Sequence, residues 1–129
     1  MDKPAASRWF EHRTLVRAAR VSMALLLIVV SWLAFRVGPP PEPSTGWDKL
    51  DHLVAFATLA LNAVLAWRLN RAARITFALL FYGALIEAVQ TLIPGRSGEL
   101  TDVLADAVGI GIGLALAAVL FQVKKTLRR

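Results

Sequence analysis

The chain has 129 residues, of which 57% are hydrophobic, a net charge of +6 and a mean hydropathy of +0.56. A soluble domain of this length cannot bury so much apolar surface, whereas a membrane protein leaves it in contact with lipid. The absence of cysteine excludes disulfides and thiolate metal sites. The basic residues flank apolar stretches and form no separate basic domain, so we expect no nucleic-acid partner.

Four apolar segments follow one another, each close to the roughly 20 residues that a helix needs to cross a bilayer. We predict membrane-spanning helices at residues 20–37, 50–67, 75–93 and 102–123. The first segment has the basic start of a signal peptide, but its end lacks a small-x-small cleavage motif, so we expect an uncleaved anchor. Cleavage would leave three spans. The sequence therefore predicts an all-α, single-domain bundle of four transmembrane helices.

Proline, glycine and polar residues mark the connections between these segments. Residues 38–46 are rich in proline and predict a stiff, extended connector. Residues 68–74 form a short polar link, which predicts that the second and third helices make an antiparallel hairpin. Pro94 and Gly95 are expected to end the third helix, and Thr101 or Asp102 to cap the N-terminus of the fourth.

The distribution of positive charge predicts the orientation of the bundle. Of the 15 Lys and Arg residues, only Arg36, Lys49 and Arg96 fall on the side opposite the two termini. Because Lys and Arg concentrate in cytoplasmic loops, we predict that both termini are cytoplasmic.

Polar side chains collect at the other, extracytoplasmic boundary, where the second helix begins, the third ends and the fourth begins. Pairs at helical spacing place them on shared faces, and ionisable groups at membrane depth tend to point into the bundle, where they pair or do chemistry. We expect a ligand-binding cluster there that comprises Asp48, Lys49, His52, Glu87, Gln90, Arg96, Asp102 and Asp106.

Small residues at four-residue intervals mark one face of the fourth helix: Ala105, Gly109, Gly113 and Ala117. Such a ridge lets the backbone of a neighbouring helix approach closely, and Gly83 forms a similar notch in the third helix. We therefore expect the fourth helix to be central to the packing. The Gly109 and Gly113 face is also a candidate surface for a homo-oligomer.

The same boundary residues carry a resemblance to a known family. Motifs of the VanZ-like family of small membrane proteins occur in the family's order: D-K-x-x-H at 48–52, E-x-x-Q at 87–90, P-G-R at 94–96 and D-x-x-x-N-x-x-G at 102–109. The resemblance covers residues 47–120. It departs at Asp106, where the family usually has asparagine. The resemblance implies a multi-pass protein of the bacterial cytoplasmic membrane with a role in the cell envelope. The founding member is linked to low-level teicoplanin resistance.

Neither the residues nor the resemblance decides what the cluster does. As an accessory protein, the chain would bind a polar or phosphate-bearing headgroup, such as a lipid-linked envelope precursor, through Lys49 and Arg96. As an enzyme, it would use His52, Glu87 and Asp102 for acid–base chemistry on that headgroup.

In a third interpretation the cluster is only a structural network among the helices. His52 would then be hydrogen-bonded to Glu87 or Asp102, and Lys49 and Arg96 would neutralise these carboxylates. The ligand types suit a divalent metal, but no H-x-x-x-H or H-E-x-x-H spacing occurs. We predict no metal or other cofactor, and membrane lipids as partners.

Overall fold

A computed structural model describes the backbone of residues 5–37, 48–96 and 98–127, with side chains described for 13–37, 49–96 and 98–127. Four α-helices occupy these ranges: α1 (Ala5–Phe35), α2 (Asp48–Trp67), α3 (Ala72–Gln90) and α4 (Leu100–Thr126). A short 3-10 helix, η1 (Leu69–Arg71), joins α2 to α3. The all-α, four-helix fold expected from the sequence is confirmed.

Each helix contains a stretch that is long and apolar enough to cross a bilayer: Arg13–Phe35, Lys49–Trp67, Leu69–Gln90 and Leu100–Thr126. Large apolar side chains cover the outside of the bundle, among them Leu25, Phe77, Phe81, Leu104 and Leu116. Such a surface is costly in water and favourable in lipid. The chain is therefore a multi-pass membrane protein.

The helix ends differ from the predicted ones. α1 begins at Ala5, well before the predicted residue 20, and the basic residues Arg13 and Arg17 therefore lie on the helix and not before it. α3 ends at Gln90, and the chain then turns through Gly95, whose φ of 81° favours glycine. The predicted proline-rich connector at 38–46 lies outside the described residues.

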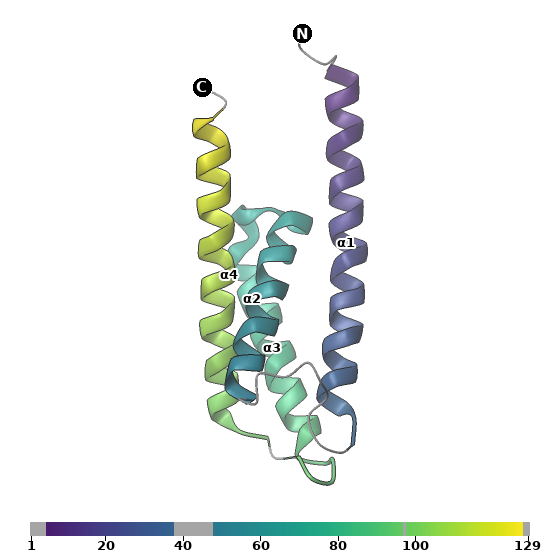
Figure 1. Cartoon of the computed structure of the whole chain (residues 1–129), viewed down its shortest axis with the longest axis vertical. Coiled ribbons are helices and arrows are strands. Elements are labelled where there is room, and N and C mark those ends of the chain that lie inside the picture. The colour runs from purple at the N-terminus through teal and green to yellow at the C-terminus, as the bar shows by residue number, and fades with distance from the viewer. Residues whose placement is uncertain (1–4, 38–47, 97, 128–129) are drawn as a thin grey trace.

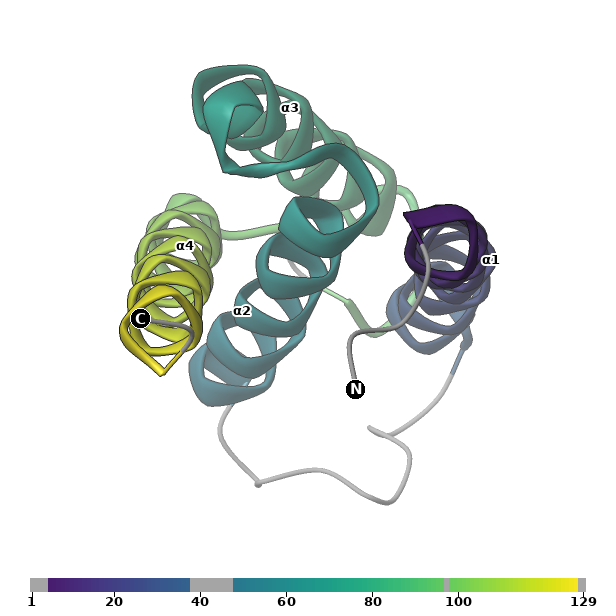
Figure 2. The same ribbon diagram turned by 90° about the horizontal axis from the view of Figure 1, so that it is seen from above.

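α2 makes the most extensive contacts with the other helices, and its largest interface is with α4, whereas α4 makes no contact with the described part of α1. The predicted hairpin of α2 and α3 forms around η1. Figure 1 shows that α1 and α4 extend beyond this hairpin at the end of the bundle where the chain starts and finishes. In the view along the bundle α1 stands apart from α4, on the far side of α2 (Figure 2). The expectation that α4 is central is thus corrected in favour of α2.

Backbone-to-backbone contact makes the α2–α4 interface close. A methyl group added at Gly109 would collide with the carbonyl oxygen of Leu53, and one at Gly113 with that of Ala57. Both glycines are buried against α2 of the same chain. The small-residue ridge therefore packs within one chain, and a homo-oligomer through this face stays a prediction that requires α2 to move away.

This packing predicts opposite effects for neighbouring glycines of α4. Gly109→Ala or Gly113→Ala should lower stability by about 1–3 kcal/mol, because the added methyl group meets fixed backbone. Gly111→Ala is the matched control, since a methyl group there has nothing within 4 Å. Thermal unfolding of the purified variants in one detergent measures the difference. Equal damage at all three positions would contradict the packing described.

Candidate functional site

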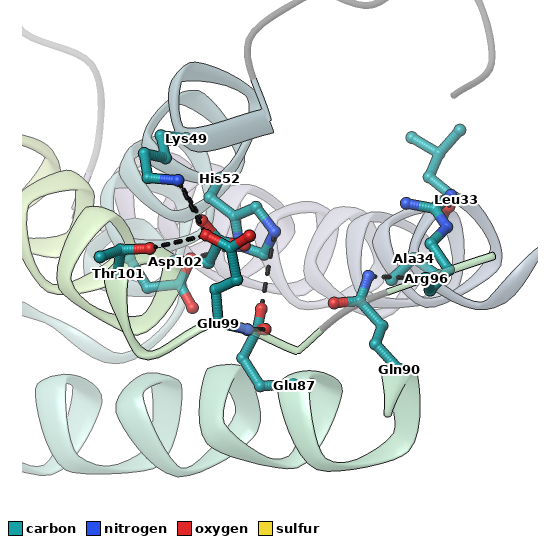
Figure 3. A network of polar contacts seen from close by, with 11 residues as sticks. Leu33, Ala34, Lys49, His52, Glu87, Gln90, Arg96, Glu99, Thr101 and Asp102 are labelled. Atoms are coloured by element: carbon teal, nitrogen blue, oxygen red, sulfur yellow. Dashed lines mark hydrogen bonds and ion pairs between the residues drawn. The ribbon is translucent and has the colours of Figure 1, made fainter. Parts of the chain in front are cut away.

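The start of α2, the end of α3 and the start of α4 meet at the end of the bundle opposite the chain termini (Figure 1). Side chains from these three helices point toward one another there, as Figure 3 shows for His52, Glu87 and Asp102. Together with Asp106 on α4 they form what we call the carboxylate–histidine cluster. The predicted convergence of these four residues is therefore present. Asp48 begins α2 nearby, and its side chain lies outside the described part of the structure.

His52 and Asp106 form the buried centre of this cluster. The Nδ1 atom of His52 lies 2.9 Å from Oδ1 of Asp106, a carboxylate with 0% of its surface exposed. Oδ2 of Asp106 faces Gly83 of α3 and has no hydrogen-bond partner. The absence of a side chain at Gly83 thus makes room for this carboxylate. The expected partners of His52 were Glu87 or Asp102, and the sequence reasoning missed Asp106 as the residue closest to it.

Glu87 approaches the other side of the imidazole ring. Its Oε1 lies 3.6 Å from Nε2 of His52 and has no hydrogen-bond partner, while its Oε2 accepts a 2.8 Å hydrogen bond from the backbone N–H of Glu99. Only 7% of Glu87 is exposed. Glu87 is thus paired with His52 and with the backbone of Glu99, and not with Arg96 or Lys49, the partners suggested by the sequence.

Asp102 contributes a second buried carboxylate, with 6% of its surface exposed. The N-cap of α4 is Glu99, so the prediction that Thr101 or Asp102 caps this helix is wrong. The hydroxyl of Thr101 donates to the side chain of Glu99 instead. Because Asp102 lies inside the first turn, its carboxylate is directed at the cluster, where Oδ1 has no hydrogen-bond partner.

Lys49 and Glu99 form the exposed rim of the cluster. The Nζ atom of Lys49 donates a 3.1 Å hydrogen bond to Glu99 and lies 3.6 Å from Oδ1 of Asp102. This hydrogen bond from Lys49 lowers the pKa of the Glu99 carboxyl below its usual value. The sequence did not predict this ion pair, because nothing in the spacing of the two residues, 50 positions apart, identifies them as partners.

Gln90 and Arg96 bind α1 and not the cluster. The amide of Gln90 donates to the carbonyl of Ala34 at 3.1 Å, and the guanidinium of Arg96 donates to that of Leu33 at 3.1 Å (Figure 3). Both carbonyls belong to the last turn of α1, which has no intrahelical donors for them. These two residues therefore attach the end of α1 to α3 and to the loop that follows it. The sequence favoured an interhelical hydrogen bond for Gln90 but did not identify α1 as the partner of either residue.

The cluster also has the composition of a cation site. His52, Glu87 and Asp102 each offer one ligand atom, and the three atoms lie within 4.8 Å of one another. Ligands of a tetrahedral zinc lie about 3.4 Å apart, as follows from metal–ligand distances of about 2.1 Å. Small movements of the three side chains would therefore bring them into range. The sequence did not predict a metal because the three ligands come from three helices and have no local spacing.

Comparison with known proteins identifies a family. A model described as VanZ/LLP1 matches residues 6–122 of this chain. The match includes most of α1, whereas the resemblance based on the motifs at 48–109 did not extend to that helix. No significant match is found among curated proteins or among solved structures.

The His52–Asp106 pair predicts an unusual pattern of rescue. His52→Ala leaves the fully buried carboxylate of Asp106 without its partner, and breaking a buried pair in this way costs about 3–5 kcal/mol. The double variant His52→Ala, Asp106→Asn removes the charge as well and should recover part of that loss. Unfolding in detergent measures both variants. A double variant that is no more stable than His52→Ala would contradict the pairing.

Proposed function

The chain belongs to the VanZ/LLP1 family, and we propose that it is an envelope protein whose carboxylate–histidine cluster holds a divalent cation, which in turn binds a phosphate-bearing lipid headgroup. In this proposal the protein lies in the bacterial cytoplasmic membrane with both termini in the cytoplasm, and the cluster faces the extracytoplasmic side. The charge distribution supports this orientation, because the basic residues concentrate at the end of the bundle that carries the termini.

One observation carries the proposal: hydrogen-bond acceptors face one another at the centre of the cluster. If the neutral imidazole of His52 donates from Nδ1 to Asp106, its Nε2 is left with a lone pair. That atom faces Oε1 of Glu87, which has no hydrogen-bond donor, and the nearest cation to Oδ1 of Asp102 is the Lys49 ammonium, 3.6 Å away and beyond hydrogen-bond distance. Buried acceptors without donors are costly, and a bound cation satisfies all three at once.

The charge balance supports the same conclusion. Carboxylates outnumber the basic side chains paired with them, since Glu99 and Asp102 pair with Lys49, and Glu87 and Asp106 pair with the imidazole of His52. The nearby Arg96 donates to the backbone of α1. Buried negative charge in excess of its partners is unfavourable at membrane depth. A divalent cation removes this excess.

The ligand set narrows the choice of ion and of headgroup. One imidazole nitrogen with two carboxylate oxygens suits Zn²⁺ or Mn²⁺ better than Ca²⁺ or Mg²⁺, which prefer oxygen ligands alone. The original candidates for phosphate binding, Lys49 and Arg96, already have acceptors in the structure. A phosphate would therefore be bound mainly by the cation, with the exposed Lys49 beside it.

Metal binding gives the direct test. The purified protein is stripped with a chelator and reloaded with Zn²⁺ or Mn²⁺, and the bound metal is counted by elemental mass spectrometry. We expect one ion per chain in the wild type. Glu87→Gln and Asp102→Asn should lower the affinity by more than about 100-fold, because loss of an outer partner of a ligand alone costs about 10- to 100-fold.

The matched control is Glu99→Gln, which removes an exposed carboxylate from the rim and leaves the three ligands in place. This variant should bind metal like the wild type. Absence of tight binding in the wild type would contradict the proposal, as would an equal loss in Glu99→Gln. Each metal-binding variant should also lose the rise in melting temperature that excess metal gives the wild type.

The orientation of His52 favours an enzyme as a second candidate. A buried carboxylate that holds one ring nitrogen and directs the other toward a reaction centre is the arrangement of a general base or of a metal-bound histidine. The metal-loaded protein is incubated with a polyprenyl phosphate lipid, and the lipid is followed by mass spectrometry. Chemical conversion of the lipid by the wild type, lost in Glu87→Gln, would support an enzyme. Binding of the lipid without conversion would support the accessory role instead.

A further inference from the structure

A second candidate site, an apolar cavity with two arginines at its edge, lies toward the end of the bundle that carries the chain termini. A partly open cavity of about 380 Å³ lies between α1, α2, η1 and α3, and its lining is almost entirely apolar. Met23 and Leu27 contribute from α1, and Ala78 and Leu79 from α3. Its volume lies at the lower end of the roughly 300–1,000 Å³ typical of ligand pockets. The space is sufficient for one hydrocarbon chain, and its lining offers water few partners.

Polar contacts join α1 to α2 and α3 on both sides of this cavity. The side chain of Asn62 donates to the carbonyl of Ala19, on one side of Met23 and Leu27 along α1. On the other side, the hydroxyl of Tyr82 donates to the carbonyl of Leu27 and lies 2.8 Å from that of Ser31. These contacts fix α1 on both sides of the cavity, and the side chains between them leave the cavity unfilled.

Two arginines and a tryptophan stand at the rim of the cavity. Arg71 and Arg74 line it and are exposed, and no described acidic side chain forms an ion pair with either. Trp67 also lines it at the end of α2, where an aromatic ring marks the level of the lipid headgroups. Guanidinium groups bind phosphate through two parallel hydrogen bonds. The cavity thus combines a phosphate-binding rim with an apolar interior.

We infer that this cavity binds one anionic phospholipid, with an acyl chain between α1 and α3 and the phosphate held by Arg71 and Arg74. Basic pockets between transmembrane helices are a recurrent way of holding such lipids. The bound chain fills the space that α1 leaves, so the lipid also stabilises the docking of α1. This site is separate from the carboxylate–histidine cluster and does not depend on the function proposed for it.

Native mass spectrometry of the full-length protein with defined lipids tests the inference. The protein is delipidated in a mild detergent and mixed with phosphatidylglycerol or with phosphatidylcholine of the same acyl chains. We expect one phosphatidylglycerol to stay bound under conditions that remove phosphatidylcholine. The double variant Arg71→Gln, Arg74→Gln should lose this lipid by about tenfold or more, the change expected when two charge-assisted contacts are removed.

Two matched controls separate a site from general attraction. Arg68→Gln removes an arginine of the same link that does not line the cavity, and it should retain the lipid. Ala78→Phe fills the cavity and should lose the lipid, whereas Ala84→Phe adds the same ring at an exposed position of α3 outside the lining and should retain it. Equal retention of the two lipids by the wild type would overturn the inference, as would an equal loss in Arg68→Gln or in Ala84→Phe.

Discussion

The close approach of α2 and α4 is the constraint on which the rest of this structure depends. Gly109 and Gly113 bring the backbone of α4 against the carbonyls of Leu53 and Ala57, with no room for a methyl group between them. In lipid, helices associate through such packing and through polar contacts, because burial of apolar surface provides little driving force there. The register set by this contact places Asp106 beside His52, and it brings Asp102 to Lys49 one turn earlier.

The other two helices are attached to this pair in different ways. α3 packs against it and leaves space at Gly83 for the carboxylate of Asp106. α1 is tied largely by side chains of its neighbours that donate hydrogen bonds to its backbone carbonyls, those of Asn62, Tyr82, Gln90 and Arg96. This kind of attachment fixes α1 at several points and leaves the cavity between them. The bundle therefore has an acidic, enclosed end and a basic end that is open toward lipid.

The sequence predicted the number and type of the helices and the convergence of His52, Glu87, Asp102 and Asp106, because hydropathy and helical spacing determine both. It did not predict the start of α1, since Arg13 and Arg17 lie before the predicted span at 20–37, although they are part of the helix in the structure. Nor did it identify α1 as the partner of the hydrogen bonds that Arg96 and Gln90 donate. Every residue has a backbone carbonyl, so the sequence does not show which carbonyls accept a side-chain hydrogen bond. From the sequence alone, Arg96 is more readily paired with a nearby carboxylate.

X-ray absorption spectroscopy of the zinc-loaded protein tests the central claim most directly, because it reports which atoms surround the ion. The chain has 2 histidines, and among the described side chains His52 is the histidine that lies at the cluster. We predict scattering from one imidazole together with oxygen ligands at about 2.0–2.2 Å. This pattern should be absent in Glu87→Gln. An ion surrounded by oxygen alone, or by two imidazoles, would contradict the assignment of the cluster as a cation site.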